Sequence, residues 1–303
     1  IPYYTRFMSV YPSLTDLAEA PLDDVLSLWT GLGYYARARN MHRAAQIVVS
    51  DFDGEFPSSV EALETLPGIG RSTAGAIMTL GQGGWAPILD GNVKRVLARF
   101  HAIEGWPGKA DVLAALWAAS ESHTPRTRTS DYTQGIMDLG ATLCTKSNPG
   151  CLYCPMSDDC RARIENRPAD FPGKKPKKAV PVRSTVFLQC IDREGRVLLE
   201  RRPPTGIWGG LWSFPEIEAK AEVADWLSDN GLTATADPTE QSRHSHTFSH
   251  FKLDITPVVC PIAAASSRIS DRDDRRWFTI DEALAIGLPA PVLKMLNTLT
   301  AKN

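Results

Sequence analysis

The sequence of 303 residues lacks any run of about 18 uncharged apolar residues, so it contains no candidate transmembrane helix. It also lacks an excess of charge, because 33 Lys and Arg stand against 35 Asp and Glu. The net charge of −2 argues at face value against a nucleic-acid binder. With 43% apolar and 22% charged residues and no low-complexity stretch, the composition is typical of a globular protein. The length predicts about two domains.

Cysteine is scarce, and six residues in a chain of this length are too few for a disulfide scaffold. A reducing compartment is therefore expected. Cys190 and Cys260 lie in apolar segments and are predicted core residues. The other four, which crowd into 17 residues, are Cys144, Cys151, Cys154 and Cys160. Four thiolates at this spacing suit either a [4Fe–4S] cluster or a tetrahedral zinc ion.

The two halves of the sequence differ in their apolar spacing. Apolar residues at 22, 25, 26 and 29 follow a proline, the pattern of one helix face, and further helices are predicted over 36–49, 58–66, 72–80, 93–100 and 109–119. Later segments predict strands at 185–190, 196–200, 248–260 and 276–278, with helices at 221–230 and 291–299. The stretch 168–181 is Pro-rich and basic. We therefore predict a helical domain over 1–167, a linker over 168–181 and a smaller α+β domain over 182–303.

A glycine-rich turn, Leu66-Pro67-Gly68-Ile69-Gly70, lies between two predicted helices and is followed by Arg71. Glycine lets the backbone approach a ligand, and the N-terminus of the following helix offers unpaired N–H groups to an anion. Such a hairpin can hold a DNA phosphate without a basic side chain. A plain turn between packed helices is the alternative.

Asp90 precedes the helix predicted at 93–100, and its simplest interpretation is an N-cap. The same position holds a carboxylate ionised. Such an anion can stabilise an oxocarbenium-like sugar while a glycosidic bond breaks, or add to C1′.

Together these motifs resemble the adenine DNA glycosylases of the MutY type, in the helix-hairpin-helix superfamily that includes endonuclease III. The resemblance covers nearly the whole chain and rests on residues 29–40, the hairpin at 66–70, residues 89–93, the cysteine spacing and residues 246–251. It implies a multidomain fold, in which an all-α helix-hairpin-helix glycosylase domain with a [4Fe–4S] loop is followed by an α+β Nudix-like domain.

The resemblance implies that the protein, as a monomer, flips adenine out of an A·8-oxoguanine or A·G pair in double-stranded DNA and hydrolyses its N-glycosidic bond. Replication and repair proteins are further implied partners. The implied location is the cytoplasm, at the bacterial nucleoid, or the nucleus or mitochondrion of a eukaryote. The short linker favours a bacterial source.

The resemblance also assigns roles to individual residues. Asp90 is implied as the catalytic aspartate and Asn92 as a positioning residue. The ligands implied for a structural [4Fe–4S] cluster are Cys144, Cys151, Cys154 and Cys160. The residues implied to contact DNA or the lesion are Tyr34, Leu66, Gly68, Gly70, Arg71, Phe248, Ser249 and His250.

Residues 248–250 are implied to form a lesion-recognition loop. Ser249 can hydrogen-bond the N7–H and O8 edge that distinguishes 8-oxoguanine from guanine, while Phe248 packs beneath and Tyr34 wedges beside the lesion. His244, His246 and His250 also suggest a metal site. No carboxylate or cysteine accompanies these histidines at ligand spacing, so lesion recognition is the favoured interpretation.

The sequence departs from this superfamily at two places. Lyases carry a lysine directly after the hairpin arginine, where this chain has Ser72, so we predict a glycosylase without strong lyase activity. The family's general-acid glutamate, which protonates adenine N7, has no counterpart here. Because the chain opens on Ile1, without a start methionine or signal peptide, we expect it to be truncated and inactive or nearly so.

Two other functions stay open as alternatives, namely a catalytically inactive lesion binder and a lyase acting on oxidised pyrimidines. Nucleotide hydrolysis by the Nudix-like domain is not expected. The R-E-x-x-E-E helix that holds Mg²⁺ in Nudix hydrolases is missing after residue 215.

Charge is unevenly distributed along the chain. Residues 1–167 carry a net charge of −3, residues 168–183 carry +4 and residues 184–303 carry −3. The lysines of the basic segment, which are expected to meet DNA phosphates, are Lys174, Lys175, Lys177 and Lys178. Local arginines expected to add to that grip are Arg37, Arg39, Arg71 and Arg95.

Overall fold

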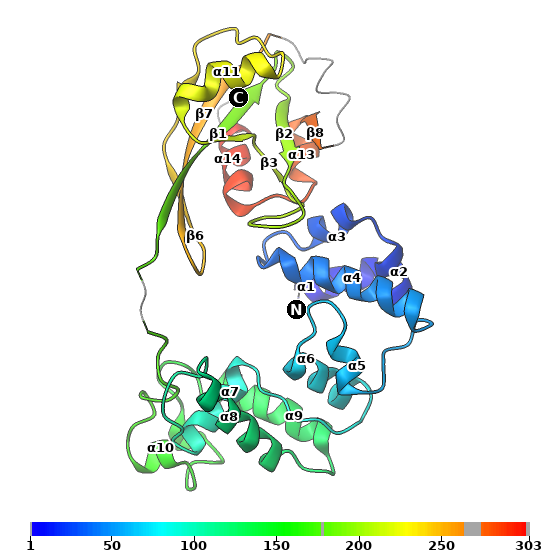
Figure 1. Ribbon diagram of the computed structural model, residues 1–303, viewed down its shortest axis with the longest axis vertical. Coiled ribbons are helices and arrows are strands. Elements are labelled where there is room, and N and C mark those ends of the chain that lie inside the picture. The colour runs from blue at the N-terminus through cyan, green and yellow to red at the C-terminus, as the bar shows by residue number, and fades with distance from the viewer. Residues whose placement is uncertain (1, 177–178, 264–273, 301–303) are drawn as a thin grey trace. The chain divides into compact units, whose positions relative to one another are not determined.

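The computed structural model describes residues 2–176, 179–263 and 274–300. The chain divides into two compact units: the first joins Ile1–Gln46 to Ala179–Asn303, and the second is Ile47–Lys178. The second unit is helical, whereas the first combines helices with a sheet (Figure 1). The predicted order of a helical part followed by a sheet part is confirmed. Within the described ranges, no helix has the length and apolarity needed to cross a membrane.

The N-terminal helices of the first unit follow the predicted spacing in part. The bounds are α1 (Pro2–Val10), α2 (Leu14–Glu19), α3 (Leu22–Leu28) and α4 (Tyr35–Asp51), the last of which continues into the second unit. In α3, Val25 and Leu26 are fully buried, which confirms the predicted apolar face. Helices α1 and α2 were not predicted. The start of α2 is set by a capping box, in which Ser13 and Asp16 bind each other's backbone N–H groups.

The second unit is built around α7 (Gly91–Phe100). Its other elements are α5 (Val60–Glu64), α6 (Arg71–Ala76), the π-helix η1 (Ile77–Gly81), α8 (Ala110–His123), α9 (Thr129–Asp138), the π-helix η2 (Leu139–Leu143), the 3₁₀ helix η3 (Cys151–Tyr153) and α10 (Arg161–Ile164). Val93 and Leu97 lie one turn apart on α7 and are buried in one core with Leu116 of α8 and Ile136 of α9. The second unit therefore depends on the helix that Asp90 begins.

The sheet of the first unit has eight strands. They are β1 (Val182–Ile191), β2 (Val197–Arg201), β3 (Trp212–Ser213), β4 (Glu216–Ile217), β5 (Thr239–Glu240), β6 (His244–Thr247), β7 (Lys252–Pro261) and β8 (Arg275–Phe278). The main path is β3-β2-β1-β7-β5, with β4 on β1, β6 on β7 and β8 on β2. The predicted β1–β2 hairpin is confirmed, because the two strands pair antiparallel around a turn in which Asp192 accepts hydrogen bonds from the backbone of Glu194 and Arg196. Strands β1 and β7 pair in parallel along ten residues each.

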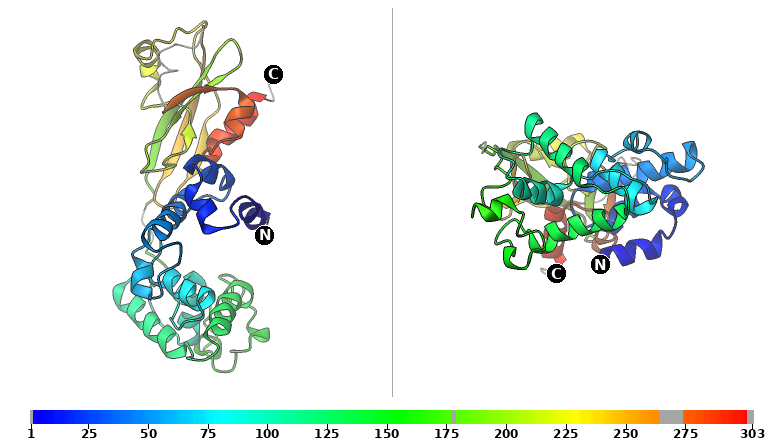
Figure 2. Two further views of the ribbon diagram at one scale, coloured as in Figure 1. Left: turned by 90° about the vertical axis from the view of Figure 1, so that its right-hand side faces the viewer. Right: turned by 90° about the horizontal axis from the view of Figure 1, so that it is seen from below.

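Helices cover the sheet on its faces (Figure 2). They are η4 (Lys220–Glu222), α11 (Val223–Asp229), α13 (Ile280–Leu284) and α14 (Ala290–Thr300). Alternate residues of β1, including Leu188 and Cys190, join Leu227 of α11 in one core cluster, as period-two alternation requires. Cys190 lies opposite Cys260 of β7, and both are fully buried, so both are core residues as predicted.

The segment predicted as a linker is partly packed against the second unit. Phe171 is buried, and the backbone N–H of Gly173 donates to the carbonyl oxygen of Gly105 at 2.9 Å. A side chain at Gly173 would meet the Gly105 backbone at 2.5 Å, so this approach requires glycine. Lys177 and Lys178 lie outside the described residues. The domain boundaries predicted from the sequence stay predictions.

Two glycines in helices of the second unit have opposite surroundings. A Cβ atom on Gly75 of α6 would lie 2.5 Å from the carbonyl oxygen of Pro87, whereas one on Gly135 of α9 would meet no atom of a neighbouring element within 4 Å among the described residues. We expect Gly75→Ala to lower the free energy of unfolding by about 1–3 kcal/mol through overpacking. Gly135→Ala is the matched control and should raise it by about 0.5–1 kcal/mol through helix propensity. Urea unfolding of both variants measures this, and equal effects would contradict the packing described.

Candidate functional site

The predicted site residues divide between the two units. In the second unit, the glycine-rich turn joins α5 to α6, as expected. Gly68 is exposed and has φ +77°, a backbone conformation that favours glycine, and Gly70 is the N-cap residue of α6. The first N–H groups of a helix have no intrahelical acceptor, so α6 directs donors toward the turn. Leu66 is only 2% exposed, so its side chain belongs to the core and not to a DNA-facing surface.

Asp90 is the N-cap residue of α7, which confirms the simplest interpretation of its position. Its Oδ1 accepts the backbone N–H of Val93 at 2.7 Å, and its carbonyl oxygen accepts that of Lys94 at 2.9 Å. The preceding residue, Leu89, donates its N–H to Oγ of Ser72 at 2.9 Å. Ser72 belongs to α6, so the helix that follows the hairpin also fixes the backbone immediately before Asp90.

Asn92 lies in the first turn of α7 and is held by an arginine. Nη2 of Arg95 donates to Oδ1 of Asn92 at 2.9 Å and to the carbonyl oxygen of Gly140 at 2.6 Å, and its Nε donates to the carbonyl oxygen of Cys144 at 2.7 Å. Two guanidinium nitrogens of Arg95 therefore bond acceptors within the protein, and its expected contact with DNA phosphates stays a prediction. Cys144 of the four-cysteine loop and Asn92, two residues after Asp90, both accept hydrogen bonds from this one arginine.

Arg99, which sequence reasoning missed, lies one turn further along α7 and is 3% exposed. Its Nη1 donates to the carbonyl oxygen of Thr145 at 2.7 Å and lies 3.3 Å from Sγ of Cys144. The other carbonyl oxygens that accept from its guanidinium belong to Cys144, Lys146, Pro168 and Phe171. Two arginines four residues apart on one helix destabilise it by repulsion. The spacing of Arg95 and Arg99 is therefore the sequence signal that could have indicated that both are bonded within the protein.

The four cysteines line one small cavity of about 30 Å³ together with Arg99. Burial raises the pKa of the Cys160 thiol, and the nearby Cys144 and Cys151 raise it further. Among the described residues, no three Cys, His, Asp or Glu side chains converge on a single-ion position. In a [4Fe–4S] cluster each thiolate binds a different iron, so its sulfurs stay further apart than the ligands of one zinc ion. The four thiols are donors that suit a [4Fe–4S] cluster or a tetrahedral zinc ion.

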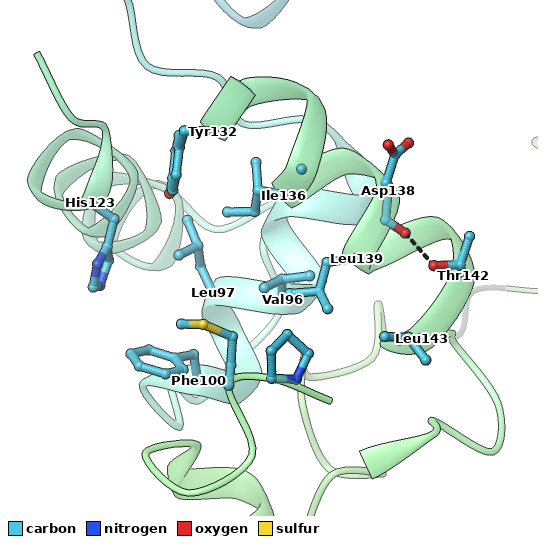
Figure 3. A pocket seen from close by; sticks show the side chains of 13 residues that line it. Val96, Leu97, Phe100, His123, Tyr132, Ile136, Asp138, Leu139, Thr142 and Leu143 are labelled. Atoms are coloured by element: carbon cyan, nitrogen blue, oxygen red, sulfur yellow. Dashed lines mark hydrogen bonds between the residues drawn. The ribbon is translucent and has the colours of Figure 1, made fainter. Parts of the chain in front are cut away.

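A separate apolar cavity of about 460 Å³ lies between α7, α8, α9 and η2 (Figure 3). Val96, Leu97 and Ile136 line it, and burial raises the pKa of the neighbouring Tyr132 to about 12. None of the predicted site residues lines this cavity. At its margin, Nε2 of His123 lies 2.7 Å from Nε2 of His101.

In the first unit, residues 248–250 form the turn between β6 and β7 (Figure 1). The N–H of Phe248 donates to the carbonyl oxygen of Phe251 at 2.8 Å, and their rings stack with centroids 4.6 Å apart. Ser249 and His250 are exposed, and Oγ of Ser249 lies 3.4 Å from Nδ1 of His250. The hairpin therefore presents a polar tip on a buried aromatic base.

Tyr34 stands at the start of α4 with φ +49° and a side chain 73% exposed. The guanidinium of Arg37 lies 4.8 Å from its ring centroid. Tyr35 is buried and donates its hydroxyl to the carbonyl oxygen of Leu288, which ties this segment to the C-terminal part of the same unit. Arg39, expected on DNA, instead donates to the carbonyl oxygen of Gly209 at 2.6 Å.

The carboxylates that follow β3 are engaged within the protein. Oε2 of Glu216 accepts from Arg202 at 2.6 Å, and its Oε1 accepts from the hydroxyl of Thr185 at 2.8 Å. Oε2 of Glu222 accepts the N–H of Glu218. This arrangement agrees with the missing Mg²⁺-binding motif.

Comparison with known proteins identifies both parts of the chain. A model for the HhH-GPD superfamily of base excision DNA repair proteins matches residues 1–121, and a model for the NUDIX domain matches residues 186–298. An adenine DNA glycosylase of Buchnera aphidicola subsp. Acyrthosiphon pisum (strain APS) is 38% identical over 297 residues, covering 98% of this chain and 84% of that protein. An adenine DNA glycosylase of Homo sapiens is 32% identical, covering 93% of this chain and 61% of that protein.

Among solved structures, a thermostable thymine-DNA glycosylase is 27% identical, with a TM-score of 0.46, over 54% of this chain and 76% of that one. The helical and Nudix-like parts together define a base-excision repair protein of the helix-hairpin-helix superfamily. More narrowly, the chain belongs to the adenine DNA glycosylase family, whose members are hydrolases of N-glycosyl bonds. The expected family and fold class are confirmed.

Removal of the Arg95 guanidinium tests whether its hydrogen bonds stabilise the second unit. Arg95→Met leaves three oxygen acceptors without this donor, so we expect the free energy of unfolding to fall by about 1.5–3 kcal/mol. Arg128→Met is the control, because it breaks only an exposed ion pair with Asp131 and should change stability by less than about 0.5 kcal/mol. Urea unfolding measures both variants. Indistinguishable midpoints would show that the Arg95 contacts do not hold the loop.

The histidine pair makes the second unit sensitive to acid. Burial, the neighbouring His123 and Arg161 lower the pKa of His101 from its ordinary 6.5. As the pH falls, the unfolded chain binds the proton before the folded one, so the stability present above about pH 6.5 is lost below it. We expect faster hydrogen exchange of the α7 amides at pH 5.5 than at pH 7.5, after correction for intrinsic rates. His101→Gln should reduce this difference, and an unchanged difference would exclude His101 as its source.

Proposed function

We propose that this protein acts in base-excision repair by removing adenine mispaired with 8-oxoguanine or guanine. The observation that carries the proposal is the position of Asp90, whose carboxylate begins α7 directly beside the helix that follows the hairpin. The proposed substrate is double-stranded DNA, from which the adenine must be flipped because the bond is unreachable inside the stack.

The chemistry proposed for Asp90 is electrostatic. The bond from the Val93 N–H fixes the carboxylate at the N-terminus of α7. As the N-glycosidic bond breaks, positive charge develops at C1′, and this anion stabilises it or adds to it before water completes hydrolysis. Asn92, held by Arg95, is proposed to position groups around the flipped nucleotide. The proton for adenine N7 is proposed to come from the general-acid glutamate that the resemblance implies and that has no counterpart in this sequence.

Ser72 supports a glycosylase without strong lyase activity. A lyase forms a Schiff base between an amine of the enzyme and the opened sugar. Ser72 supplies no amine, and its hydroxyl oxygen accepts the N–H of Leu89.

The hairpin is the proposed anchor for a DNA phosphate. Gly68 and Gly70 are exposed, so a phosphate can approach the backbone and the first N–H groups of α6. The exposed Arg71, which stacks on Trp117 with its guanidinium 4.0 Å from the ring centroid, can add a charge. A grip built on backbone donors explains how a chain of net charge −2 can bind DNA.

Lesion recognition is proposed for the first unit. Ser249 is exposed at the tip of the β6–β7 turn, where its hydroxyl can bond the N7–H and O8 edge of 8-oxoguanine. Phe248 packs beneath it, and His250 lies beside it. The exposed Tyr34 is proposed to wedge into the stack next to the lesion.

The proposed cofactor is a [4Fe–4S] cluster held by Cys144, Cys151, Cys154 and Cys160. Its contribution when bound is structural, since it cross-links the loop that Arg95 and Arg99 attach to α7. We propose further that the protein acts as a monomer in the compartment that holds the DNA, and that replication or repair proteins dock on it.

A single-turnover assay on duplexes with A·8-oxoguanine, A·G or thymine glycol tests the proposed function. We expect the 303-residue chain to bind the A·8-oxoguanine duplex tightly without releasing adenine, and a chain extended by the segment with the general acid to release it. In the extended chain, Asp90→Asn should lower the rate by about 10²–10³-fold or more. Asparagine caps a helix as well as aspartate does, so folding should be unchanged.

Three other outcomes would decide against parts of this proposal. Borohydride trapping of the protein on DNA would show a Schiff base and so a lyase. Release of a lesion other than adenine would refute the substrate. Binding without release by the extended chain would favour the second candidate, an inactive lesion binder, which the missing general acid supports.

A further inference from the structure

Trp208 is a buried aromatic residue in the glycine-rich turn between β2 and β3 of the first unit, after an exposed stretch at 203–206. It is 8% exposed and has φ +54°, a left-handed conformation that is uncommon for a bulky residue. Such a conformation persists where surrounding contacts determine it. The contacts of Trp208 therefore show what the turn is built to hold.

One side of these contacts is the lesion-recognition hairpin. The Trp208 indole has its ring centroid 5.3 Å from that of His246 on β6 and 5.2 Å from that of Phe248 at the tip. The rings of His246 and Phe248 are 4.7 Å apart and nearly perpendicular. Three aromatic rings thus pack together next to Ser249 in the chain, at separations where aromatic pairs attract.

The second group of contacts consists of the hydrogen bonds that close the turn around Trp208. Nε of Arg202 donates to the carbonyl oxygen of Ile207, and the N–H of Gly210 donates to the carbonyl oxygen of Arg202. A Cβ atom on Gly209 would lie 2.5 Å from the carbonyl oxygen of Pro204, so the turn closes tightly only with glycine there. The closed turn leaves the carbonyl oxygen of Gly209 as the acceptor for Arg39.

Arg39 joins the turn to the start of α4. Its Nη1 donates to the carbonyl oxygen of Gly209 at 2.6 Å, and burial lowers the pKa of its guanidinium. Arg39 lies little more than one helical turn from Tyr34. Within the first unit, the chain at the start of α4 links Tyr34 to Arg39, Arg39 bonds Gly209 next to Trp208, and Trp208 contacts Phe248 next to Ser249.

We propose that Trp208 and Arg39 are positioning residues that set the specificity for 8-oxoguanine. A hydroxyl that distinguishes two bases by one hydrogen-bonded edge must be held within about 0.5 Å, and a four-residue strand followed by an exposed tip does not hold itself. Trp208 supports the tip from below, and Arg39 fixes Trp208 relative to Tyr34. This inference rests on the proposed contact of Ser249 with the lesion.

The test measures dissociation constants of the 303-residue chain for matched duplexes with A·8-oxoguanine and A·G at one salt concentration. Their ratio reports specificity. We expect Trp208→Leu and Arg39→Met to reduce the ratio by about tenfold, since that corresponds to about 1.4 kcal/mol, the contribution of one hydrogen bond. Affinity for A·G should hardly change. Trp208→Phe, which keeps an aromatic ring, should retain most of the ratio.

Arg43→Met is the matched control, because Arg43 is exposed one turn further along α4 and bonds only locally to Gln46. It should leave the ratio unchanged. Hydrogen exchange of amides 246–251 should accelerate in Arg39→Met but not in Arg43→Met. This readout applies to Arg39 even if Trp208→Leu fails to fold.

Ser249→Ala separates the two possible failures. If it leaves the ratio unchanged, the proposed lesion contact is wrong. If it lowers the ratio while folded Trp208→Leu and Arg39→Met do not, the positioning inference is overturned. An equal loss of affinity for both duplexes would also overturn it, because that is the result of general destabilisation.

Discussion

The structure of the second unit depends on two guanidinium groups placed one turn apart on α7. Arg99 is buried and Arg95 is half-buried, and both donate to carbonyl oxygens, three of which lie in the loop that begins at Cys144. A buried cation without such acceptors would be strongly destabilising. This requirement fixes the cysteine loop against the same helix whose first turn holds Asp90. The proposed cluster site and catalytic carboxylate are consequently parts of one rigid element.

The fold class, the hairpin and the cap formed by Asp90 could be predicted from the sequence because each is encoded locally, by apolar spacing, by glycine or by an N-cap residue. The partners of arginine could not. Arg39 and Arg95 look like surface cations in the sequence, and only the folded chain brings Gly209 and Cys144 to them. Trp208 was missed for the same reason, since its neighbours His246 and Phe248 are distant in sequence. Helix α1 has no buried residue, so no apolar face marked it.

Net charge proved a poor guide to nucleic-acid binding in this chain. At least two of the 33 Lys and Arg are committed to internal acceptors, so the sum overstates the positive charge available to DNA. The donors of the helix N-termini, in contrast, contribute nothing to the sum and still attract phosphate. Cations that are bonded within the protein lower the affinity for phosphate that the net charge suggests, whereas backbone N–H donors raise it. The composition therefore does not give the sum of the two effects.

The discontinuity of the first unit has a consequence for biosynthesis. Residues Ile1–Gln46 are synthesised before the strands and turns with which they group, which lie from Ala179 onward. The contiguous second unit can close in the meantime, whereas Tyr35 and Arg39 must wait for Leu288 and Gly209. During that interval the hydroxyl of Ser27 on α3 also lacks its acceptor, the carbonyl oxygen of Ala285. Synthesis of the part from Ala179 onward is thus the step that brings Tyr35 and Arg39 to their acceptors.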